Sequence, residues 1–373
     1  MVSGITKLPI SVNQEQAMSV YKLLARVNKT IGQLDAFYKK SIVDESILSL
    51  LSYNESVQST RIEGTQVTFH EIMETKENKN LSWQQQEVIN YKEAIDYGIR
   101  QLKDGMPIST RLIKELHGIL MRDARGTTAN GGEYRKIQNF IGPDNKRENA
   151  TYIPIPANEI DDYMANLEHF INGMNHRSFE FDKKQSFEYF DYQSDPLIKI
   201  AIAHAQFESI HPFLDGNGRL GRILIALLAV KDSLVEAPLF FVSEELEKER
   251  IRYYNTLNAT RGENPDWFTW ITFFLKASER MASKLIKQLE RADSLAESGL
   301  AQCETTSQKR VWVATFSQPV TTSSRIARKL EIHNTTAKKS LDFLAEKGLL
   351  EKEQHVKRNI KYFNYDLLRV ISD

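Results

Sequence analysis

A twelve-residue run from His211 to Arg222 holds several side chains that can act on phosphate groups. It reads His-Pro-Phe-Leu-Asp-Gly-Asn-Gly-Arg-Leu-Gly-Arg. The imidazole of His211, with an ordinary pKa of about 6.5, can accept a proton at neutral pH. The carboxylate of Asp215 is a hard oxygen ligand of the kind that holds Mg²⁺ between phosphates. The run therefore predicts a site in which a base, a metal ligand and anion donors act together.

Glycine and arginine residues of the same run favour binding of an anion. Gly216 and Gly218 put no side chain in the way of a phosphate that approaches the backbone. The apolar stretch Ile223 to Leu228 predicts a helix whose first N–H groups are unpaired and whose dipole attracts negative charge. Arg219 and Arg222 are three residues apart, so both guanidinium groups can hold neighbouring phosphates from one side of the first turn.

Two other interpretations of the run explain fewer of its residues. The segment Gly216 to Gly221 matches G-x-G-x-x-G, the dinucleotide-binding pattern of Rossmann folds, and Glu236 would serve as the acid that follows it. That pattern requires a strand before it, whereas Ile198 to Ile210 has helical periodicity. A purely structural turn would explain His-Pro or Asp-Gly-Asn-Gly, but not two arginines in register. With the Asn217 amide as a further phosphate donor, the pattern is typical of nucleotidyl transfer to a hydroxyl.

The run resembles the Fic motif, HPFx(D/E)GNGRxxR, at every fixed position. The resemblance implies a protein adenylyltransferase that moves AMP from ATP to a Ser, Thr or Tyr hydroxyl of a target protein and releases pyrophosphate. It makes His211 the catalytic general base and Asp215 the Mg²⁺ ligand. It assigns the phosphates of ATP to Gly216, Asn217, Gly218, Arg219 and, for the terminal phosphate, Arg222. Gly218 favours AMP transfer, because the related Doc toxins, which act as kinases, have Lys there.

A second region resembles the flap of a Fic core. The β-prone pieces Lys136 to Ile141 and Ala150 to Ile155 flank a polar turn and predict a β-hairpin. By resemblance, this hairpin docks the target peptide through β-strand addition. Its docking residues are then Ile141, Gly142, Tyr152 and Pro154.

A third region, Arg250 to Leu257, resembles the wall of the adenine pocket. It contains Tyr253, Tyr254 and Asn255, although core packing is an equally good interpretation of the two tyrosines. His204 lies seven residues before His211 and is a poor partner for a zinc pair. We expect it to be a hydrogen-bonded core histidine.

The segment Ser59 to Gly64 resembles the family's inhibitory motif, (S/T)xxxE(G/N). Gly64 is typical of the residue just past a helix, which puts Glu63 at the negative end of the helix dipole. A carboxylate there needs a cation, and the resemblance names Arg222. Because an arginine held by Glu63 cannot hold the terminal phosphate, we expect an autoinhibited enzyme whose inhibitory residues are Ser59, Glu63 and Gly64.

The chain is expected to be mainly α. Apolar residues recur at three- and four-residue spacing through most of the first 290 positions. We expect an N-terminal helical region with the inhibitory helix at 1–105 and an all-helical Fic core with a β-hairpin flap at 106–290. The polar, Ser/Thr/Glu-rich stretch 291–309 predicts a linker.

Residues 310–373 predict a small winged helix-turn-helix domain. Two helical patterns, Ser323 to Leu330 and Asn334 to Lys347, precede two short strands around a turn at Gln354 to Asn359. From Ser307 onward the chain has 13 basic and 7 acidic residues, so this part is modestly basic. Its candidate DNA contacts are Asn334, Thr335, Thr336, Lys338, Lys339, Lys357 and Arg358. The rival hypothesis is therefore a DNA-binding transcriptional regulator; protein docking and dimerisation are other uses of such a domain.

Composition narrows the remaining classes. One cysteine, Cys303, among 373 residues excludes an internal disulfide and a cysteine-cluster zinc site. No stretch reaches the roughly 18 to 20 apolar residues that span a bilayer, and the N-terminus lacks a signal-peptide pattern. We therefore expect a cytoplasmic protein with no membrane partner. The resemblance also implies a homodimer and auto-AMPylation, with de-AMPylation at the same site as an alternative activity.

Overall fold

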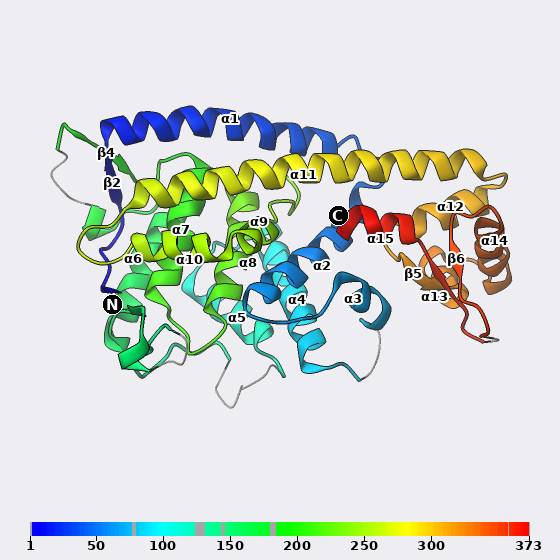
Figure 1. The fold of residues 1–373 in the computed structure, drawn as a ribbon, viewed down its shortest axis with the longest axis horizontal. Coiled ribbons are helices and arrows are strands. Elements are labelled where there is room, and N and C mark those ends of the chain that lie inside the picture. The colour runs from blue at the N-terminus through cyan, green and yellow to red at the C-terminus, as the bar shows by residue number, and fades with distance from the viewer. Residues whose placement is uncertain are drawn as a thin grey trace.

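Helices make up most of the computed structural model, which describes residues 2–76, 80–123, 131–142, 146–179, 184–356 and 358–372 (Figure 1). The helices are α1 (Gln14–Tyr38), α2 (Asp44–Ile62), α3 (Phe69–Thr75), α4 (Trp83–Lys103), α5 (Thr110–Leu120), α6 (Ile160–Asn172), α7 (Pro196–Ile210), α8 (Asn217–Lys231), α9 (Ser243–Lys248), α10 (Arg250–Ala259), α11 (Trp267–Gln302), α12 (Thr306–Ala314), α13 (Ser323–Leu330), α14 (Asn334–Glu346) and α15 (Tyr365–Ser372). The strands are β1 (Val2–Ser3), β2 (Ile10–Asn13), β3 (Tyr152–Ile153), β4 (Phe187–Phe190), β5 (Val320–Thr322), β6 (Glu351–Lys352) and β7 (Lys361–Phe363). The expectation of a mainly α chain is confirmed.

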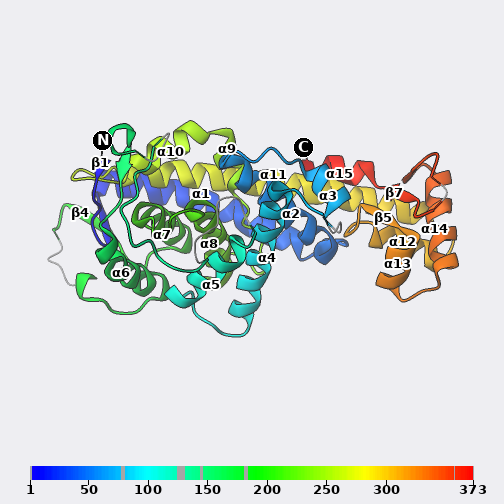
Figure 2. The same ribbon diagram turned by 90° about the horizontal axis from the view of Figure 1, so that it is seen from below.

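Two long helices, α1 and α11, lie side by side along the molecule (Figure 1, Figure 2). Helix α1 begins with a capping box, in which the side chains of Asn13 and Gln16 each accept a backbone N–H of the other residue. Its buried residues recur every three or four positions and so form one apolar face: Ala17, Val20, Leu24, Val27, Ile31, Leu34 and Tyr38.

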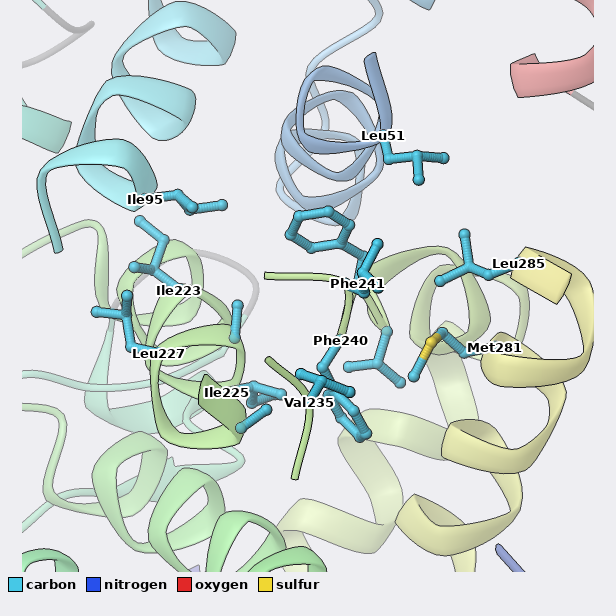
Figure 3. Close-up of a cluster of buried hydrophobic side chains, with 14 of the residues drawn as sticks. Leu51, Ile95, Ile223, Ile225, Leu227, Val235, Phe240, Phe241, Met281 and Leu285 are labelled. Atoms are coloured by element: carbon cyan, nitrogen blue, oxygen red, sulfur yellow. The ribbon is translucent and has the colours of Figure 1, made fainter. Parts of the chain in front are cut away.

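Helices α7 and α8 form the centre of the core. Asp195 caps α7 and Pro196 occupies its first turn, where the missing N–H costs nothing. Every residue of α7 after Pro196 is buried, including the charged Lys199 and Glu208, so the helix is enclosed on all sides by the core. Figure 3 shows side chains of α8 in one apolar cluster with those of α2, α4 and α11; the labelled members from these helices are Ile223, Ile225, Leu227, Leu51, Ile95, Met281 and Leu285. Helix α2, which ends just before Glu63, therefore shares its core with α8, which contains the second half of the run 211–222.

The expected hairpin is present but short. Ile141 and Tyr152 form a single antiparallel bridge, in which Ile141 N donates to Tyr152 O at 2.9 Å. The expectation of a strand at 136–140 is wrong. Instead, the side chains of Arg135 and Asn139 donate to carbonyl groups of the loop that follows α7. The segment is therefore held by side-chain hydrogen bonds and not by strand pairing.

The N-terminal strands were not expected, and they tie the start of the chain to the core. β1 pairs in parallel with β3 of the hairpin. β2 pairs antiparallel with β4, in a register that runs from Ile10 opposite Phe190 to Asn13 opposite Phe187. The stretch 1–105 is therefore helical only from Gln14 onward.

The expectation of a linker at 291–309 is wrong. Helix α11 continues to Gln302 and α12 begins at Thr306. The buried residues of this last part of α11 are small, so they give little hydrophobic signal in the sequence: Ala292, Ala296 and Gly299. Trp312 packs over Gly299, and its indole N–H donates to Ala296 O at 2.9 Å. Small side chains here make room for a tryptophan.

The C-terminal elements follow the predicted order. Helices α13 and α14 match the two predicted helices, and β5, β7 and β6 form a three-stranded sheet in that spatial order. Strand β5 and helix α15 were not predicted. Lys357 lies outside the described residues. Helix α15 returns to the body of the protein, where Gln288 of α11 donates to Val370 O and Ile371 O at 3.1 Å.

Among the described residues, no helix combines the length and the apolar character that crossing a membrane requires.

Candidate active site

The loop between α7 and α8 is shaped by Asn217 and Gly216. The Asn217 side chain accepts the N–H of Phe213 and donates to its carbonyl, both at 2.9 Å. Its amide is therefore engaged within the loop. Gly216 has a φ of +78°, and a Cβ there would lie 2.7 Å from the sulfur of Met121. Only glycine fits this position, because both the backbone conformation and the space exclude a side chain.

His117, which the sequence analysis missed, supports the loop from α5. Its ring stacks on Phe213 with centroids 3.8 Å apart. Nδ1 accepts the N–H of Gly132 at 2.8 Å, so Nε2 carries the proton and donates to Asp215 O at 3.0 Å. Burial lowers the pKa of His117 to about 4. The neutral ring therefore holds the loop through one stacking contact and its hydrogen bond to Asp215 O.

His211 stands at the end of α7 in a left-handed conformation, with a φ of +51°. Arg135, itself buried, holds this backbone from outside: its Nε donates to His211 O at 2.9 Å. Arg261 approaches from the turn after α10 and donates to Ser209 Oγ at 3.0 Å and to Glu208 O at 3.3 Å. The two arginines fix a strained turn that a non-glycine residue rarely adopts.

The surroundings of the His211 imidazole keep it neutral. Burial lowers its pKa to about 3, and the charges of Arg261 and Arg135 act in the same direction. Nδ1 lies 3.4 Å from Glu208 O, a long hydrogen bond that assigns the proton to Nδ1. Nε2 then retains its lone pair and can accept a proton at neutral pH.

His211 opens into a cavity of about 590 Å³ that also borders α2, α8, α10 and the hairpin. Nine residues predicted from the sequence line it: Glu63, Ile141, Gly142, His211, Gly218, Arg222, Tyr253, Tyr254 and Asn255. Six further residues line it: Ile251 and Leu257, which lie within the predicted segment Arg250 to Leu257, and four that were not predicted, Thr151, Glu208, Asn258 and Arg261. The other predicted residues are not part of the lining: Ser59, Gly64, Tyr152, Pro154, Asp215, Gly216, Asn217 and Arg219.

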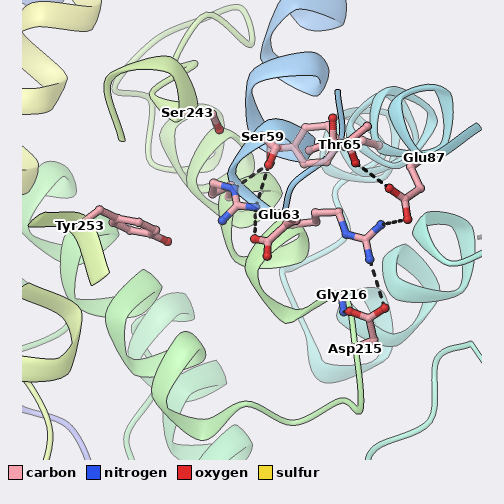
Figure 4. Close-up of polar contacts among 12 residues, drawn as sticks. Ser59, Glu63, Thr65, Glu87, Asp215, Gly216, Ser243 and Tyr253 are labelled. Carbon is pink, nitrogen blue, oxygen red and sulfur yellow. Dashed lines mark hydrogen bonds and ion pairs between the residues drawn. The ribbon is translucent and has the colours of Figure 1, made fainter. Parts of the chain in front are cut away.

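The predicted inhibitory contact is present in this cavity. Helix α2 ends at Ile62, Glu63 caps it, and Gly64 follows with a φ of +97°, as expected past a helix end. Nη2 of Arg222 donates to Glu63 Oε1 at 2.6 Å. Its Nε donates to Ser59 Oγ at 2.7 Å (Figure 4). The Arg222 side chain is 1% exposed, so water cannot compensate its charge. Among the described residues, Glu63 is its ion-pair partner.

The missing side chain of Gly218 leaves room for the Glu63 carboxylate beside Arg222. A Cβ at Gly218 would lie 2.5 Å from Glu63 Oε1 and 3.1 Å from Arg222 Nη1. A side chain at this position would therefore displace Glu63 or the guanidinium that it binds.

Family models match two adjacent parts of the chain. The model of the Fic/DOC family matches residues 107–229, and that of the Fic/DOC family N-terminal region matches residues 21–100. Together they match more than half of the chain and contain every residue of the contact between α2 and α8. The chain belongs to the Fic/DOC family.

Relatives and solved structures agree with this assignment. The protein adenylyltransferase Fic of Drosophila grimshawi is 25% identical over 179 residues, which are 46% of this chain and 32% of the relative. That of Drosophila mojavensis is 26% identical over 46% of this chain and 30% of the relative. The matching region thus spans about a third of these relatives. A Fic family protein from Desulfovibrio desulfuricans G20 has the same fold, with a TM-score of 0.58 and 18% identity over 96% of this chain and 98% of that chain. Fic-1 of C. elegans gives a TM-score of 0.52 at 18% identity, covering 74% of each chain.

The first arginine of the Fic motif points away from the cavity. Nη1 of Arg219 forms an ion pair with Glu87 Oε1 of α4 at 3.1 Å, and Nη2 lies 3.4 Å from Asp215 Oδ2. Glu87 in turn accepts a hydrogen bond from Thr65 Oγ1 at 3.0 Å (Figure 4). Sequence spacing did not reveal Glu87, because it lies 132 positions before its partner.

His204 and Tyr253 of the Fic core contact each other. His204 is fully buried, and its Nε2 lies 2.9 Å from the Tyr253 hydroxyl. The prediction of a hydrogen-bonded core histidine is confirmed. Tyr253 is 1% exposed, so it packs in the core and also lines the cavity, while Tyr254 is 41% exposed at the mouth. The core packing of Tyr253 is therefore confirmed, and its contact with adenine stays a prediction.

Glu208 is a buried acid in the wall of the same cavity. It is 6% exposed, and its Oε1 has no hydrogen-bond partner among the described residues. Burial raises its pKa to about 7, although the charge of Arg222 acts in the opposite direction.

We expect Glu208→Gln to stabilise the protein more as the pH rises. The folded pKa lies above the ordinary value of 4.5, so the carboxyl favours folding below about pH 4.5, and this contribution is lost as the pH rises through about 7. The measured quantity is the free energy of unfolding of Glu208→Gln minus that of the wild type. This difference should be larger at pH 8 than at pH 4.5 by about 1 to 3 kcal/mol. Urea unfolding at both pH values measures this, with the exposed Glu93→Gln as the control. An equal difference at both pH values would contradict it.

Proposed function

We propose that this protein transfers AMP from ATP to a Ser, Thr or Tyr hydroxyl of a target protein. The observation that carries the proposal is the common cavity of His211, Gly218 and Arg222, which brings a neutral base and a buried guanidinium to the start of α8. The name of the curated relatives, protein adenylyltransferase, supports the same chemistry.

In this proposal Nε2 of His211 takes the proton of the target hydroxyl. The hydroxyl oxygen then forms a bond to the α-phosphorus of ATP, and the bond between that phosphorus and the bridging oxygen breaks. Pyrophosphate leaves with the electron pair. The depressed pKa of His211 keeps the imidazole neutral at neutral pH, with its proton on Nδ1, so Nε2 is free to act as general base.

Phosphate binding is assigned to the start of α8. Its first N–H groups and the positive end of its dipole attract an anion, and Gly218 leaves the approach open. Arg222 would hold the terminal phosphate once Glu63 has left. Tyr254 and Asn255 of α10 line the other side of the cavity and would contact the adenine.

Asp215 is the residue that fits Mg²⁺. Its side chain is 64% exposed, and its two oxygens accept from Gly216 N at 2.6 Å and from Arg219 at 3.4 Å, which leaves lone pairs free. Among the described residues no group of three His, Cys, Asp or Glu side chains could hold a metal. That agrees with Mg²⁺, which binds to one or two carboxylates together with substrate phosphates. Bound there, Mg²⁺ would neutralise phosphate charge.

ATP labelled at the α- or the γ-phosphate tests the proposal. Glu63→Gly protein is incubated with either label and a cell lysate, and modified proteins are identified by mass spectrometry. AMP transfer labels proteins from α-labelled ATP only. Labelling from γ-labelled ATP above that of the lysate without this protein would instead identify a kinase, and no labelling above that background from either nucleotide would refute both.

A second function, DNA binding, is proposed for the C-terminal elements. Helix α14 follows α13 after a three-residue turn and exposes Asn334, Thr335, Lys338 and Lys339. A helix so presented, next to the β6–β7 hairpin, is typical of recognition in the major groove.

The full-length protein should bind duplex DNA with an affinity that falls as salt rises. Replacing Lys338 and Lys339 by alanine should weaken binding and reduce the slope of log K against log salt by about 2, because each lysine would neutralise one phosphate. Fluorescence anisotropy with a labelled duplex measures both. An affinity independent of salt would contradict DNA binding.

A further inference from the structure

Asp215, Arg219, Glu87 and Thr65 form a chain of polar contacts that joins the motif loop to the N-terminal helices (Figure 4). Each link uses a different atom. Arg219 offers Nη2 to Asp215 and Nη1 to Glu87, and Glu87 keeps its other oxygen, Oε2, for the Thr65 hydroxyl. Because these three contacts use separate atoms, all of them can persist together.

The middle residues of this series of contacts are buried, whereas Asp215 at its end is exposed to solvent. The side chains of Arg219 and Glu87 are 5% and 9% exposed, and Thr65 is 3% exposed. The Asp215 side chain is 64% exposed. A buried guanidinium without a carboxylate partner is strongly unfavourable, so Glu87 determines where Arg219 lies. Arg219, fixed in this way, is one of two donors that orient the Asp215 carboxylate; Gly216 N is the other.

We propose that Glu87 is a positioning residue for the metal ligand: it holds Arg219, which holds the Asp215 carboxylate in the orientation that Mg²⁺ requires. The inference rests on the proposed role of Asp215. Glu87 does not line the cavity, so we assign it no contact with nucleotide or target. Its effect is on the carboxylate alone, so it should appear in the affinity for Mg²⁺ and not in the affinity for ATP without metal.

Thr65 links this arrangement to the inhibitory residue. It stands two positions after Glu63, and its N–H donates to Thr60 O of α2 at 3.2 Å. The turn that carries Glu63 to Arg222 therefore also carries Thr65 to Glu87. The two motif arginines are thus held from the same turn, one by Glu63 directly and the other through Glu87.

The test compares Glu63→Gly with Glu63→Gly/Glu87→Gln by calorimetric titration of ATP, at a series of Mg²⁺ concentrations and in EDTA. Glutamine keeps the size of the side chain but removes the charge that holds Arg219. We expect the Mg²⁺ concentration at half-maximal enhancement of ATP binding to rise about 10-fold. The affinity for ATP in EDTA should stay within about twofold, because an outer carboxylate acts through the metal.

Glu93→Gln in the same background is the matched control. Glu93 lies on the same helix as Glu87, and its side chain is 48% exposed. It forms an ion pair with Arg122, at a distance of 3.2 Å, and has no contact with the motif loop among the described residues. Its Mg²⁺ dependence should equal that of Glu63→Gly. Thr65→Val removes the hydroxyl that holds Glu87 but leaves the ion pair, and it should shift the Mg²⁺ dependence in the same direction by a smaller factor.

An unchanged Mg²⁺ dependence in Glu87→Gln would overturn the inference, as would an equal loss of ATP affinity with and without Mg²⁺. If Glu87→Gln does not fold, Thr65→Val decides between the same outcomes. Failure of the proposed function looks different: Glu63→Gly would then bind no ATP, or would bind it and transfer no AMP in the labelling experiment.

Discussion

Glu63→Gly is expected to raise AMP transfer by roughly 5- to 150-fold, the range of a coupling free energy of about 1 to 3 kcal/mol. The Glu63 carboxylate accepts a hydrogen bond from Arg222 at 2.6 Å and lies next to Gly218. In our proposal the terminal phosphate would take the same place. Glycine removes this competitor and suits a position before Gly64. The initial rate of AMP incorporation from α-labelled ATP measures the change.

The same substitution should lower the melting temperature without ATP. It leaves Arg222, 1% exposed, without its carboxylate, and a buried charge without a partner is unfavourable. ATP supplies a new partner, so saturating ATP should restore the melting temperature. Asp104→Gly is the matched control, since the exposed Asp104 also caps a helix, α4, with a negative φ of −78°, and is followed by Gly105 as Glu63 is by Gly64. Equal rates for the wild type and Glu63→Gly would sink the autoinhibition hypothesis.

His211→Ala in the Glu63→Gly background is expected to reduce AMP transfer by about 10²- to 10⁴-fold, the usual contribution of a general base. The imidazole is the neutral base in the cavity, and its backbone is fixed by Arg135. ATP binding, measured by calorimetry, should change little, because the phosphates are assigned to α8. Loss of transfer with retained binding is the expected pair of results.

The left-handed backbone of His211 calls for a second variant. Alanine is strained at a φ of +51°, whereas asparagine tolerates it, so His211→Asn tests loss of the base with less change in the loop. His355→Asn is the matched control, because His355 has a φ of +68° and lies in the C-terminal hairpin region. Persistent AMP transfer by both His211 variants would rule out the catalytic assignment.

The separate parts of the site were predictable because each has a local signal. The run 211–222 combines a base, glycines and arginines within one turn and the start of a helix, and the segment 59–64 ends a helix with Glu and Gly. Such features depend on neighbouring residues alone. The structure brings Glu63 to Arg222, as the resemblance implied.

Predictions from the local sequence pattern were wrong where the contacts of a residue depend on partners that the pattern does not show. Asn217 was expected at a phosphate, but both ends of its amide bind Phe213 within the loop. Arg219 was expected beside Arg222, but α4 offers Glu87 on the other side. The stretch 291–309 reads as a linker because the side chains that pack there are alanine and glycine.

The sequence by itself determined the chemistry available to this protein: a histidine base, a carboxylate for Mg²⁺, and a glycine-rich turn before a helix, all within twelve residues. Only the tertiary structure decided which groups are free to act. Arg219 and Arg222 lie three residues apart in the motif, yet the packing of α4 and α2 gives them different partners, Glu87 and Glu63. The physical reason is burial: once water is excluded, each guanidinium needs a carboxylate, and the fold determines which one is near.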